Sequence, residues 1–508
     1  MLNKKVMIVS LGCDKNLVDT EKMLGILADE GCTFTDDEAQ AQVIIVNTCC
    51  FIGDAKEESI QNILDLARFK TEGKLEALIA TGCLSQRYQD EMLEELPELD
   101  GILGISAWHT IADVVREALE GKRPRNLMST GVLNSHTTKR LLTTGGHYAY
   151  LKIAEGCNKR CTYCVIPSVR GAYVSVPMEE LEKEARELAA EGVKELILVA
   201  QETTVYGIDL YKKKMLPELL HRLCAIPGIV WIRLLYCYPE EITPELVQVM
   251  KEEKKICHYL DMPIQHSSDR ILKKMGRRTN RKELLDKIEM LRTEIPDIVL
   301  RTTLITGFPG ETQEDFEEML SFVDMVGFER LGVFPYSPEE GTPAAEMEDQ
   351  IDEEVKKQRR DAIMELQQEI SFDFEADCVG EKLLVMIEGY LPDEHAYVGR
   401  TYMDAPGIDG YIFIKSGEAL MSGDFAEAVV TGSDEYDLIG ELYEEKELEE
   451  YLEKGIQDEI LLPVKKGRQV IYDMVKSGIC IIYKFRSKEE EEVMQKLYDL
   501  KTGEGQKS

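Results

Sequence analysis

Between residues 147 and 374, short apolar segments alternate with helical patterns, and this alternation limits the possible folds more than any other feature. Six of these segments have the length and composition of buried strands: YAYLKIAE, ELILVAQE, WIRLLYCYP, YLDMPIQH, VLRTTLITG and LGVFPYS. Amphipathic helical patterns separate them, for example over 178–191 and 313–326, and a long charged helix is expected over 351–374. Six β/α units predict a parallel sheet closed into a partial (β/α)6 barrel, with its chemistry at the carboxyl ends of the strands.

The first 120 residues repeat the alternation on a smaller scale. The strand patterns are KVMIVSLG, AQVIIVNT and LEALIATG, and helical patterns cover residues 20–30 and 56–69. This predicts a separate N-terminal parallel α/β domain over 1–120. Residues 121–146 are polar and irregular, so they are interpreted as a linker.

The C-terminal quarter has a different pattern. In residues 375–441, short alternating runs are separated by Gly, Pro and Asp, which is typical of a small all-β barrel. The tail, 442–508, contains an acidic helix-like run, a short apolar segment (GICIIYKF) and a second charged helical pattern. It is interpreted either as a small subdomain or docking arm, or as a solvated appendage.

Composition narrows the class of protein further. With 508 residues the chain is long enough for about three domains, and its net charge of −35 repels nucleic acid and favours basic partners. Thirteen cysteines are too few for a disulfide scaffold in a chain of this size, so they are expected to be cytosolic thiols or metal ligands. The start, MLNKKVMIVSLGC, mimics a lipoprotein signal, but its apolar run is interpreted as a strand. No segment reaches the roughly 18 apolar residues of a membrane span, so a cytoplasmic protein is expected.

Three cysteines at C-x3-C-x2-C spacing, Cys157, Cys161 and Cys164, follow directly on the first strand of the predicted barrel. A structural zinc site would need a fourth Cys or His, and none lies within ten residues after Cys164. A four-iron cluster held by three thiolates keeps one iron open, and an open metal position is where a substrate binds. Plain buried thiols remain the alternative.

A second set of cysteines lies in the N-terminal domain. Cys13, Cys49 and Cys83 come just past the carboxyl ends of three successive predicted strands, and ligands bind at this edge of open α/β sheets. Each thiol alone would be interpreted as inert, but three convergent thiolates form a second three-point iron–sulfur site. Cys50 adjoins Cys49 and points the other way if the backbone is extended. The remaining cysteines are expected to be structural: Cys32, Cys224, Cys237, Cys257, Cys378 and Cys480.

The segment YLKIAEGCNKRCTYCVIPSVRG resembles the signature of the radical S-adenosylmethionine (SAM) superfamily, a C-x3-C-x2-C motif after the first strand of a partial barrel. The resemblance implies that SAM chelates the open iron of a 4Fe-4S cluster and is split to a 5′-deoxyadenosyl radical. It also implies SAM contacts at the end of the fifth strand, in LITGFPGET, for Gly307, Pro309, Gly310 and Glu311. Four more polar residues near strand ends are candidates for SAM or substrate contact, or for structural hydrogen bonding: Gln201, Glu202, Gln265 and Arg301.

Residues 4–441 resemble the methylthiotransferase family, which joins a three-cysteine domain, a radical SAM barrel and a C-terminal TRAM barrel. The segments SLGCDKNLVDTE, FPYSPEEGTPAA and VGRTYMDAPGIDG look like the RimO branch. The family pattern favours Cys49 over Cys50 as the ligand. The sequence departs from the branch at Asp14, where proline is usual, and at Cys50, where glycine is common.

The resemblance implies that a methylthio group is added to the β-carbon of an aspartate in the twelfth small-subunit ribosomal protein. It also implies two 4Fe-4S clusters, two SAM molecules and an external electron donor, with no catalytic residue beyond the cluster ligands. The alternatives are a tRNA adenosine methylthiotransferase of the MiaB or MtaB type and an iron–sulfur electron carrier or scaffold. Residues 375–441 contain 15 acidic and three basic side chains (3 − 15 = −12). This net negative charge favours a basic protein over tRNA as the substrate. A pure electron carrier would need no open iron.

Overall fold

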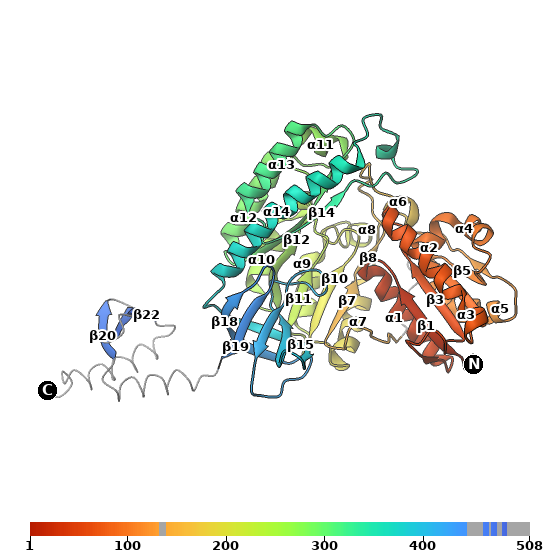
Figure 1. Cartoon of the computed structure of the whole chain (residues 1–508), viewed down its shortest axis with the longest axis horizontal. Helices are drawn as coiled ribbons and strands as arrows, with labels where there is room; N and C mark the ends of the chain where they lie inside the picture. The colour runs from red at the N-terminus through yellow and green to blue at the C-terminus, as the bar shows by residue number, and fades with distance from the viewer. Residues whose placement is uncertain (132–138, 444–460, 467–468, 475–479, 485–508) are drawn as a thin grey trace. The chain divides into compact units, whose positions relative to one another are not determined.

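The computed structural model describes residues 1–131, 139–443, 461–466, 469–474 and 480–484, in two compact units, Met1–Glu441 and Leu442–Ser508. The first unit contains three parts of distinct architecture (Figure 1). They are an N-terminal parallel α/β domain, a parallel partial barrel and a small closed β-barrel, so the predicted fold class is confirmed.

The N-terminal domain is a six-stranded parallel sheet in the order β2-β1-β3-β4-β5-β6. Its central strands are buried along their whole length, because helices cover both faces of a parallel sheet and leave no face for polar residues. The strands are β1 (Lys5–Ser10), β2 (Thr33–Phe34), β3 (Val43–Thr48), β4 (Ala77–Gly82), β5 (Gly101–Leu103) and β6 (Arg125–Asn126). The helices are α1 (Asp14–Asp29), α2 (Gly53–Ala67), α3 (Phe69–Glu72), α4 (Cys83–Glu95) and α5 (Ile111–Leu119), with a 3-10 turn at Ile105–Thr110.

Two boundaries in this region differ from the sequence-based expectation. The first helix was expected over 20–30 but begins at Asp14, because its first turns carry polar side chains that are nevertheless buried and hide the apolar period. The sheet also continues past residue 120, because β6 pairs with β5 inside the segment interpreted as a linker. Farther along this segment, Arg140 is buried and forms an ion pair with Glu21 of α1 at 2.5 Å.

The central domain is a parallel sheet of six strands in the order β14-β13-β12-β11-β10-β7, so each strand of the pattern lies beside the next one along the chain. The strands are β7 (Tyr148–Lys152), β10 (Glu195–Val199), β11 (Trp231–Leu234), β12 (Ile256–Asp261), β13 (Val299–Thr306) and β14 (Arg330–Pro335). The helices are α6 (Ile166–Val169), α7 (Met178–Ala190), α8 (Ile208–Tyr211), α9 (Leu216–Cys224), α10 (Pro244–Glu252), α11 (Asp269–Lys274), α12 (Arg281–Glu294) and α13 (Gln313–Val326). Strands β8 (Ala154–Glu155) and β9 (Val174–Ser175) pair antiparallel beside the barrel.

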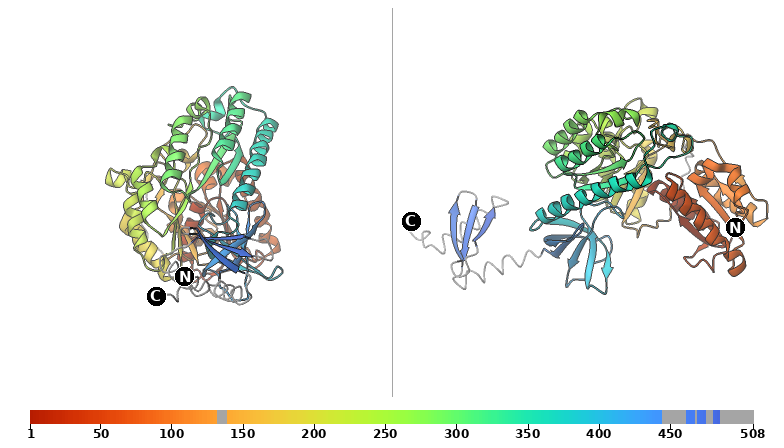
Figure 2. Two further views of the ribbon diagram at one scale, coloured as in Figure 1. Left: turned by 90° about the vertical axis from the view of Figure 1, so that its left-hand side faces the viewer. Right: turned by 45° about the horizontal axis from the view of Figure 1, so that its top comes forward.

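Helix α13 has the predicted bounds because its ends carry strong local signals. Thr312 and Asp315 form a reciprocal capping box at the start, and Gly327 ends the helix with a left-handed φ of +57°. Helix α14 (Glu353–Asp377) packs along β14 and α13 and leads from the barrel to the small β-barrel, as Figure 2 shows.

The small barrel closes five strands in the order β15-β16-β17-β19-β18, with β17 and β19 parallel. Its strands are β15 (Lys382–Leu391), β16 (Ala396–Arg400), β17 (Ile412–Lys415), β18 (Phe425–Ser433) and β19 (Leu438–Leu442). Buried ion pairs join it to the amino-terminal ends of the larger barrel's strands: Arg400 to Glu195 at 2.7 Å and Asp404 to Arg330 at 2.6 Å. The small barrel therefore covers the end of the partial barrel opposite to the carboxyl ends of its strands.

One carboxylate at this joint makes stability depend on pH. Burial raises the pKa of Glu375 to about 7 from its ordinary 4.5; nearby Arg330 opposes the shift, and Asp404 reinforces it. Arg330 Nη2 lies 2.8 Å from Glu375 Oε1, yet neither oxygen of Glu375 has hydrogen-bond geometry to a partner. A raised folded-state pKa contributes stability below pH 4.5 that is lost as the pH rises through about 7.

We therefore expect the melting temperature of Glu375→Gln to rise relative to that of the parent as the pH increases from about 4.5 to about 7. Above pH 7 this difference should stay constant. Thermal melts of both proteins at pH 5 to 8 measure the difference. Glu369→Gln, at an exposed position on the same helix, should show no such trend. A constant difference across this range would contradict the assignment.

The second unit contains a three-stranded antiparallel sheet of β20 (Leu461–Lys466), β21 (Gln469–Met474) and β22 (Cys480–Lys484). Strand β22 lies within the predicted apolar segment. The two charged helical patterns of the tail lie outside the described residues. Among the helices that the structure does describe, none is both long and apolar enough to cross a bilayer.

Candidate iron–sulfur sites

The first cysteine set lies on the loop that follows β8. Gly156 starts this loop with φ +78°, and a Cβ there would lie 2.3 Å from the carbonyl oxygen of Ala172, so only glycine lets the loop approach its return segment. Cys157 and Cys161 are buried and Cys164 is half-buried. The Cys164 amide donates to the Cys161 carbonyl at 3.1 Å, which brings these two cysteines into one turn.

The three thiols influence one another electrostatically. Burial, reinforced by the other two cysteines, raises the pKa of Cys164 to about 12. Burial also raises the pKa of Cys157 to about 11, with contributions from Glu202 and Cys161. The bare thiols of Cys157 and Cys164 are therefore protonated at neutral pH, and a bound metal must displace their protons and supply the compensating positive charge.

Buried polar atoms without hydrogen-bond partners surround this set. Glu202 Oε2 has none, its nearest cation is Lys159 Nζ at 3.6 Å, and burial raises the pKa of this carboxyl to about 7. Gln201 donates to Glu155 at 2.8 Å, but its own Oε1 is unpartnered. The Tyr173 hydroxyl and two guanidinium nitrogens of Arg277 are also buried without a hydrogen-bond partner. Such atoms favour a polar ligand beside the cysteines, so these residues fit a cluster with SAM bound to it.

The loop after β13 contains the four predicted SAM neighbours at Gly307–Glu311. Gly307 has φ +68°, and a Cβ there would lie 2.2 Å from Lys356 Cγ, so the backbone passes directly against α14. The Glu311 carboxylate accepts hydrogen bonds from the Gly307 amide at 2.9 Å and from Arg359 at 2.7 Å, and lies 3.3 Å from His266 Nε2. Both oxygens of Glu311 are thus committed to protein groups, so Glu311 shapes the loop. SAM contact by Gly307, Pro309, Gly310 and Glu311 stays a prediction.

The two other candidates at strand ends have structural partners. Gln265 has a left-handed φ of +73°, and its backbone bridges to β13 through Thr303 and Ile305, each at 2.8 Å. Arg301 donates to Asp261 at 3.0 Å and to Asp409 of the small barrel at 3.3 Å. Its guanidinium joins the two barrels, and contact of Gln265 or Arg301 with SAM or substrate remains a prediction.

The second cysteine set lies at the carboxyl edge of three adjacent strands, β1, β3 and β4. Cys13 is the N-cap of α1, Cys49 follows β3, and Cys83 begins α4. Burial raises the pKa of Cys83 to about 12, opposed by Arg170 and reinforced by Cys13. Burial and the neighbouring Cys13 also raise the pKa of Cys49. The three cysteines of the second trio thus lie near enough to influence one another electrostatically, and their joint binding of a cluster stays a prediction.

Neither trio resembles a site for a single metal ion. Within the described ranges, no three His, Cys, Asp or Glu side chains meet closely enough to hold one ion. In a four-iron cluster each cysteine binds a different iron, so its three thiols must stand apart around a cube. Each set supplies three thiols, which matches the donor type of such a cluster, and cluster binding at each set stays a prediction.

Two glycines hold the second trio together. Gly12 and Gly82 each precede a cysteine, and both have φ +93°. A Cβ at Gly12 would lie 2.8 Å from Cys49 Cβ, and one at Gly82 would lie 2.5 Å from the Thr48 carbonyl oxygen. The loops that carry Cys13 and Cys83 therefore close on the loop that carries Cys49 only because these two residues have no side chain.

We expect Gly12→Ala to lower the iron bound at the second trio by displacing Cys49, while the first trio keeps its iron. The measurement is iron content per chain after anaerobic reconstitution, with the first trio intact and with it replaced by alanines. Gly121→Ala is the matched control, because Gly121 has φ +76° and nothing within 4 Å of the added Cβ. Both variants carry a backbone strain of about 1–2 kcal/mol, so equal iron loss in the two would contradict the steric explanation.

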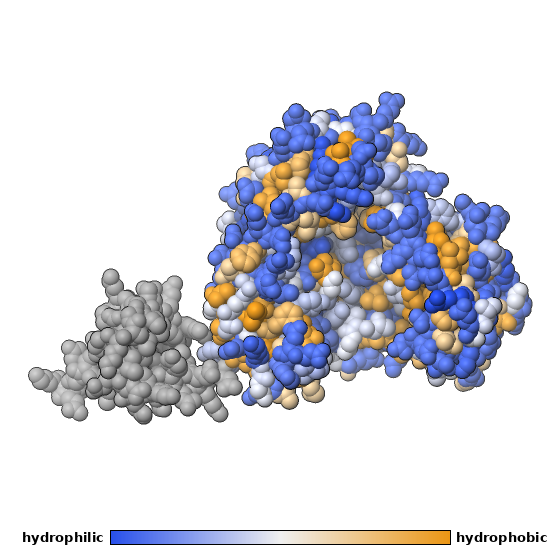
Figure 3. Space-filling view, in the orientation of Figure 1, coloured by the Kyte–Doolittle hydropathy of each residue, from blue (hydrophilic) through white to orange (hydrophobic). Residues whose placement is uncertain are grey.

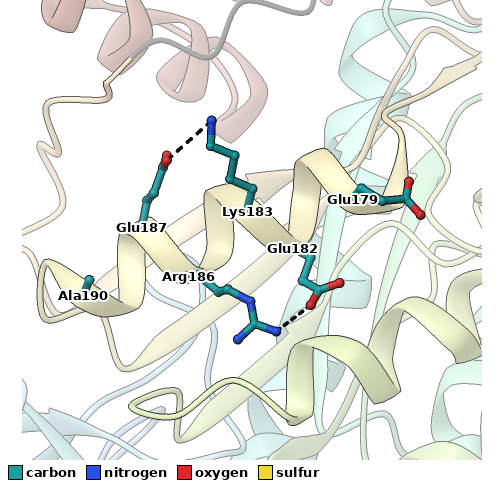
Figure 4. A pocket seen from close by; sticks show the side chains of 6 residues that line it. All are labelled: Glu179, Glu182, Lys183, Arg186, Glu187 and Ala190. Carbon is teal, nitrogen blue, oxygen red and sulfur yellow. Dashed lines mark hydrogen bonds and ion pairs between the residues drawn. The ribbon is translucent and has the colours of Figure 1, made fainter.

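The surface shows where a substrate could approach. Figure 3 shows a hollow between the N-terminal domain and the partial barrel, with white and orange residues in and around it. A separate shallow depression on α7 has a different character (Figure 4). It is lined by Glu179, Glu182, Lys183, Arg186, Glu187 and Ala190. Ion pairs one helical turn apart, Glu182–Arg186 and Lys183–Glu187, occupy it, and neither cysteine set contributes to it. This depression is a solvated helix face.

Comparison with family profiles follows the three parts of the first unit. Residues 151–323 match the radical SAM superfamily, residues 5–104 match the uncharacterized protein family UPF0004, and residues 379–442 match the TRAM domain. Among solved structures, the radical SAM methyltransferase TsrM from Kitasatospora setae has a TM-score of 0.49 at 14% identity, covering 67% of this chain and 77% of that chain. The fold and the first cysteine set define a radical SAM enzyme.

Curated relatives refine this class. The ribosomal protein uS12 methylthiotransferase RimO of Lachnoclostridium phytofermentans is 59% identical over 436 residues, which cover 86% of this chain and 99% of the relative. The proteins of the same name from Thermoanaerobacter sp. and Clostridioides difficile are 50% and 48% identical, covering 86–87% of this chain and 99–100% of each relative. The chain belongs to the RimO family of radical SAM methylthiotransferases.

Proposed function

We propose that this enzyme adds a methylthio group to the β-carbon of an aspartate in ribosomal protein uS12, using two 4Fe-4S clusters and two SAM molecules. The observation that carries the proposal is the presence of two separate three-thiol sets, each at the carboxyl edge of its own parallel sheet. The names of relatives at 48–59% identity support uS12 as the substrate. The ribosomal substrate places the reaction in the cytoplasm, and an external donor must supply electrons.

The two sets have separate tasks in this proposal. Cys157, Cys161 and Cys164 would hold the cluster that binds SAM, and Cys13, Cys49 and Cys83 would hold the auxiliary cluster. When bound, the clusters and SAM supply the radical chemistry and the methylthio group, because cofactors of this kind carry the difficult steps. The chain's residues bind these groups, hold them in a fixed relative orientation and exclude water from the space between them.

The small barrel favours a protein substrate over tRNA. Its composition is acidic, and two of the three basic residues of 375–441 are engaged: Arg400 is buried with Glu195, and Lys382 pairs with Glu427, while Lys415 is exposed. Nucleic-acid binding depends on basic residues that neutralise phosphates, whereas an acidic surface attracts a basic ribosomal protein.

A substrate competition tests the proposal. The reduced, reconstituted enzyme is incubated with SAM and either purified uS12, assembled small subunits or tRNA, and the products are analysed by mass spectrometry. A methylthio gain on an aspartate of uS12 is expected, with isotope from labelled methyl-SAM in the added group. Modification of tRNA without modification of uS12 would overturn the substrate assignment. A protein that binds only four irons would overturn the two-cluster assignment.

A further inference from the structure

Arg170 links the chain segment that follows the first cysteine set to Cys83 of the second set, and neither the motif nor the candidate residues pointed to it. It is the sixth residue after Cys164 and directly follows the short helix α6, Ile166–Val169. Its side chain is fully buried, and Nη2 lies 3.3 Å from the sulfur of Cys83 in the N-terminal domain. A residue from the radical SAM motif region thus donates a hydrogen bond to a thiol of the auxiliary set.

Asn16 orients the Arg170 guanidinium toward the Cys83 sulfur. Its Nδ2 donates to the carbonyls of Leu11 and Thr48, both at 3.1 Å, and these residues lie on the loops that carry Cys13 and Cys49. Its Oδ1 accepts a hydrogen bond from Arg170 Nη2 and lies 3.9 Å from the Cys83 sulfur. The guanidinium is therefore aimed at the sulfur by a side chain that contacts the loops of all three cysteines.

The charge of Arg170 is balanced on its far side. Arg170 Nη1 donates to Glu155 at 2.7 Å, and Glu155 accepts from Lys152 at 2.9 Å, which in turn pairs with Asp19 of α1. Arginine does not lose its proton in proteins, so this cation is permanent. Its Nε has no hydrogen-bond partner, so the guanidinium is not saturated by protein groups.

We propose that Arg170 is a positioning residue that raises the reduction potential of the auxiliary cluster through its hydrogen bond to Cys83. A donor to a ligating sulfur withdraws electron density from the iron, and hydrogen bonds to sulfur together with local charge are the main protein controls on cluster potential. The inference rests on the proposed function, because it requires a cluster at Cys13, Cys49 and Cys83.

The test uses the full chain with Cys157, Cys161 and Cys164 replaced by alanine, so that only the auxiliary cluster is reconstituted with iron and sulfide. The potential is measured by redox titration followed by electron paramagnetic resonance. Arg170→Gln combined with Glu155→Gln replaces the charged guanidinium donor by a shorter neutral amide without leaving a buried, unpaired carboxylate. Arg170→Lys keeps the charge and loses the fork geometry.

We expect the potential to fall in the Gln double variant and to fall less in Arg170→Lys, with iron still bound. Arg87→Gln is the matched control: Arg87 bridges to Glu339 at 2.9 Å and to the Cys50 carbonyl at 3.2 Å, but contacts no ligand sulfur. Its potential should equal that of the parent.

Unchanged potentials in both Arg170 variants would overturn the inference. Loss of iron from both, in chains that still melt cooperatively, would also overturn it and leave Arg170 a structural role only. If the parent with the intact auxiliary trio binds no cluster, the two-cluster function fails first, and the inference fails with it.

Discussion

Replacing Cys161 with alanine is expected to abolish SAM cleavage and methylthiolation, with activity falling by roughly 10³-fold or more. Cys161 is the middle member of the first set, is buried, and its sulfur lies 3.7 Å from the Tyr238 hydroxyl within the ring of unpartnered polar atoms. With two thiols left, the cluster loses one of only three protein ligands. The measurements are 5′-deoxyadenosine release and iron content after reconstitution, and about half of the bound iron should remain, held by the second set.

Cys237→Ala is the matched control for this prediction. Cys237 is fully buried just after β11, and its sulfur lies 3.4 Å from the Thr203 hydroxyl, close to the site but outside the trio. It should keep both clusters and most activity. Cys161→Ala protein that still cleaves SAM at the parent rate would refute the assignment of this motif.

The second large effect is expected from replacing one of two adjacent cysteines, Cys49 and Cys50, whose side chains point in different directions. Cys49→Ala should lose the auxiliary cluster and methylthiolation while 5′-deoxyadenosine release continues, and Cys50→Ala should keep both activities. Cys49 lies against the Cys13 loop, since its sulfur is 3.0 Å from where a Cβ on Gly12 would stand. Cys50 instead packs in an apolar cluster that includes Ile63 and Leu84.

The pKa shifts agree with the burial of Cys50: desolvation, only partly offset by Arg87, raises the pKa of this thiol to about 11. Cys50 also lies near enough to raise the pKa of Cys83, so the pair needs a direct experiment. Iron content, product mass and 5′-deoxyadenosine are measured for each variant. Loss of the cluster in Cys50→Ala but not in Cys49→Ala would reverse the ligand assignment.

Most of the architecture was predictable from the sequence because its signals are local. Buried parallel strands appear as continuous apolar runs, and all six barrel strands were found from them. Helix α13 was found from its amphipathic pattern, and in the structure the capping box and Gly327 mark its ends. The start of α1 was missed by six residues, because burial of its polar first turns depends on partners such as Arg170 and Lys152, more than a hundred residues away.

The sequence by itself determined the chemistry of the first set, because the spacing of Cys157, Cys161 and Cys164 places three thiols within one short loop. Only the tertiary structure decided how distant groups are used. Glu311 and Arg301 were candidates for contact with SAM or substrate, and the structure adds that Glu311 pairs with Arg359 and Arg301 with Asp409. The contact of Arg170 with Cys83 spans 87 positions. Spacing fixes geometry over a few residues, whereas contacts between distant segments depend on how whole domains pack.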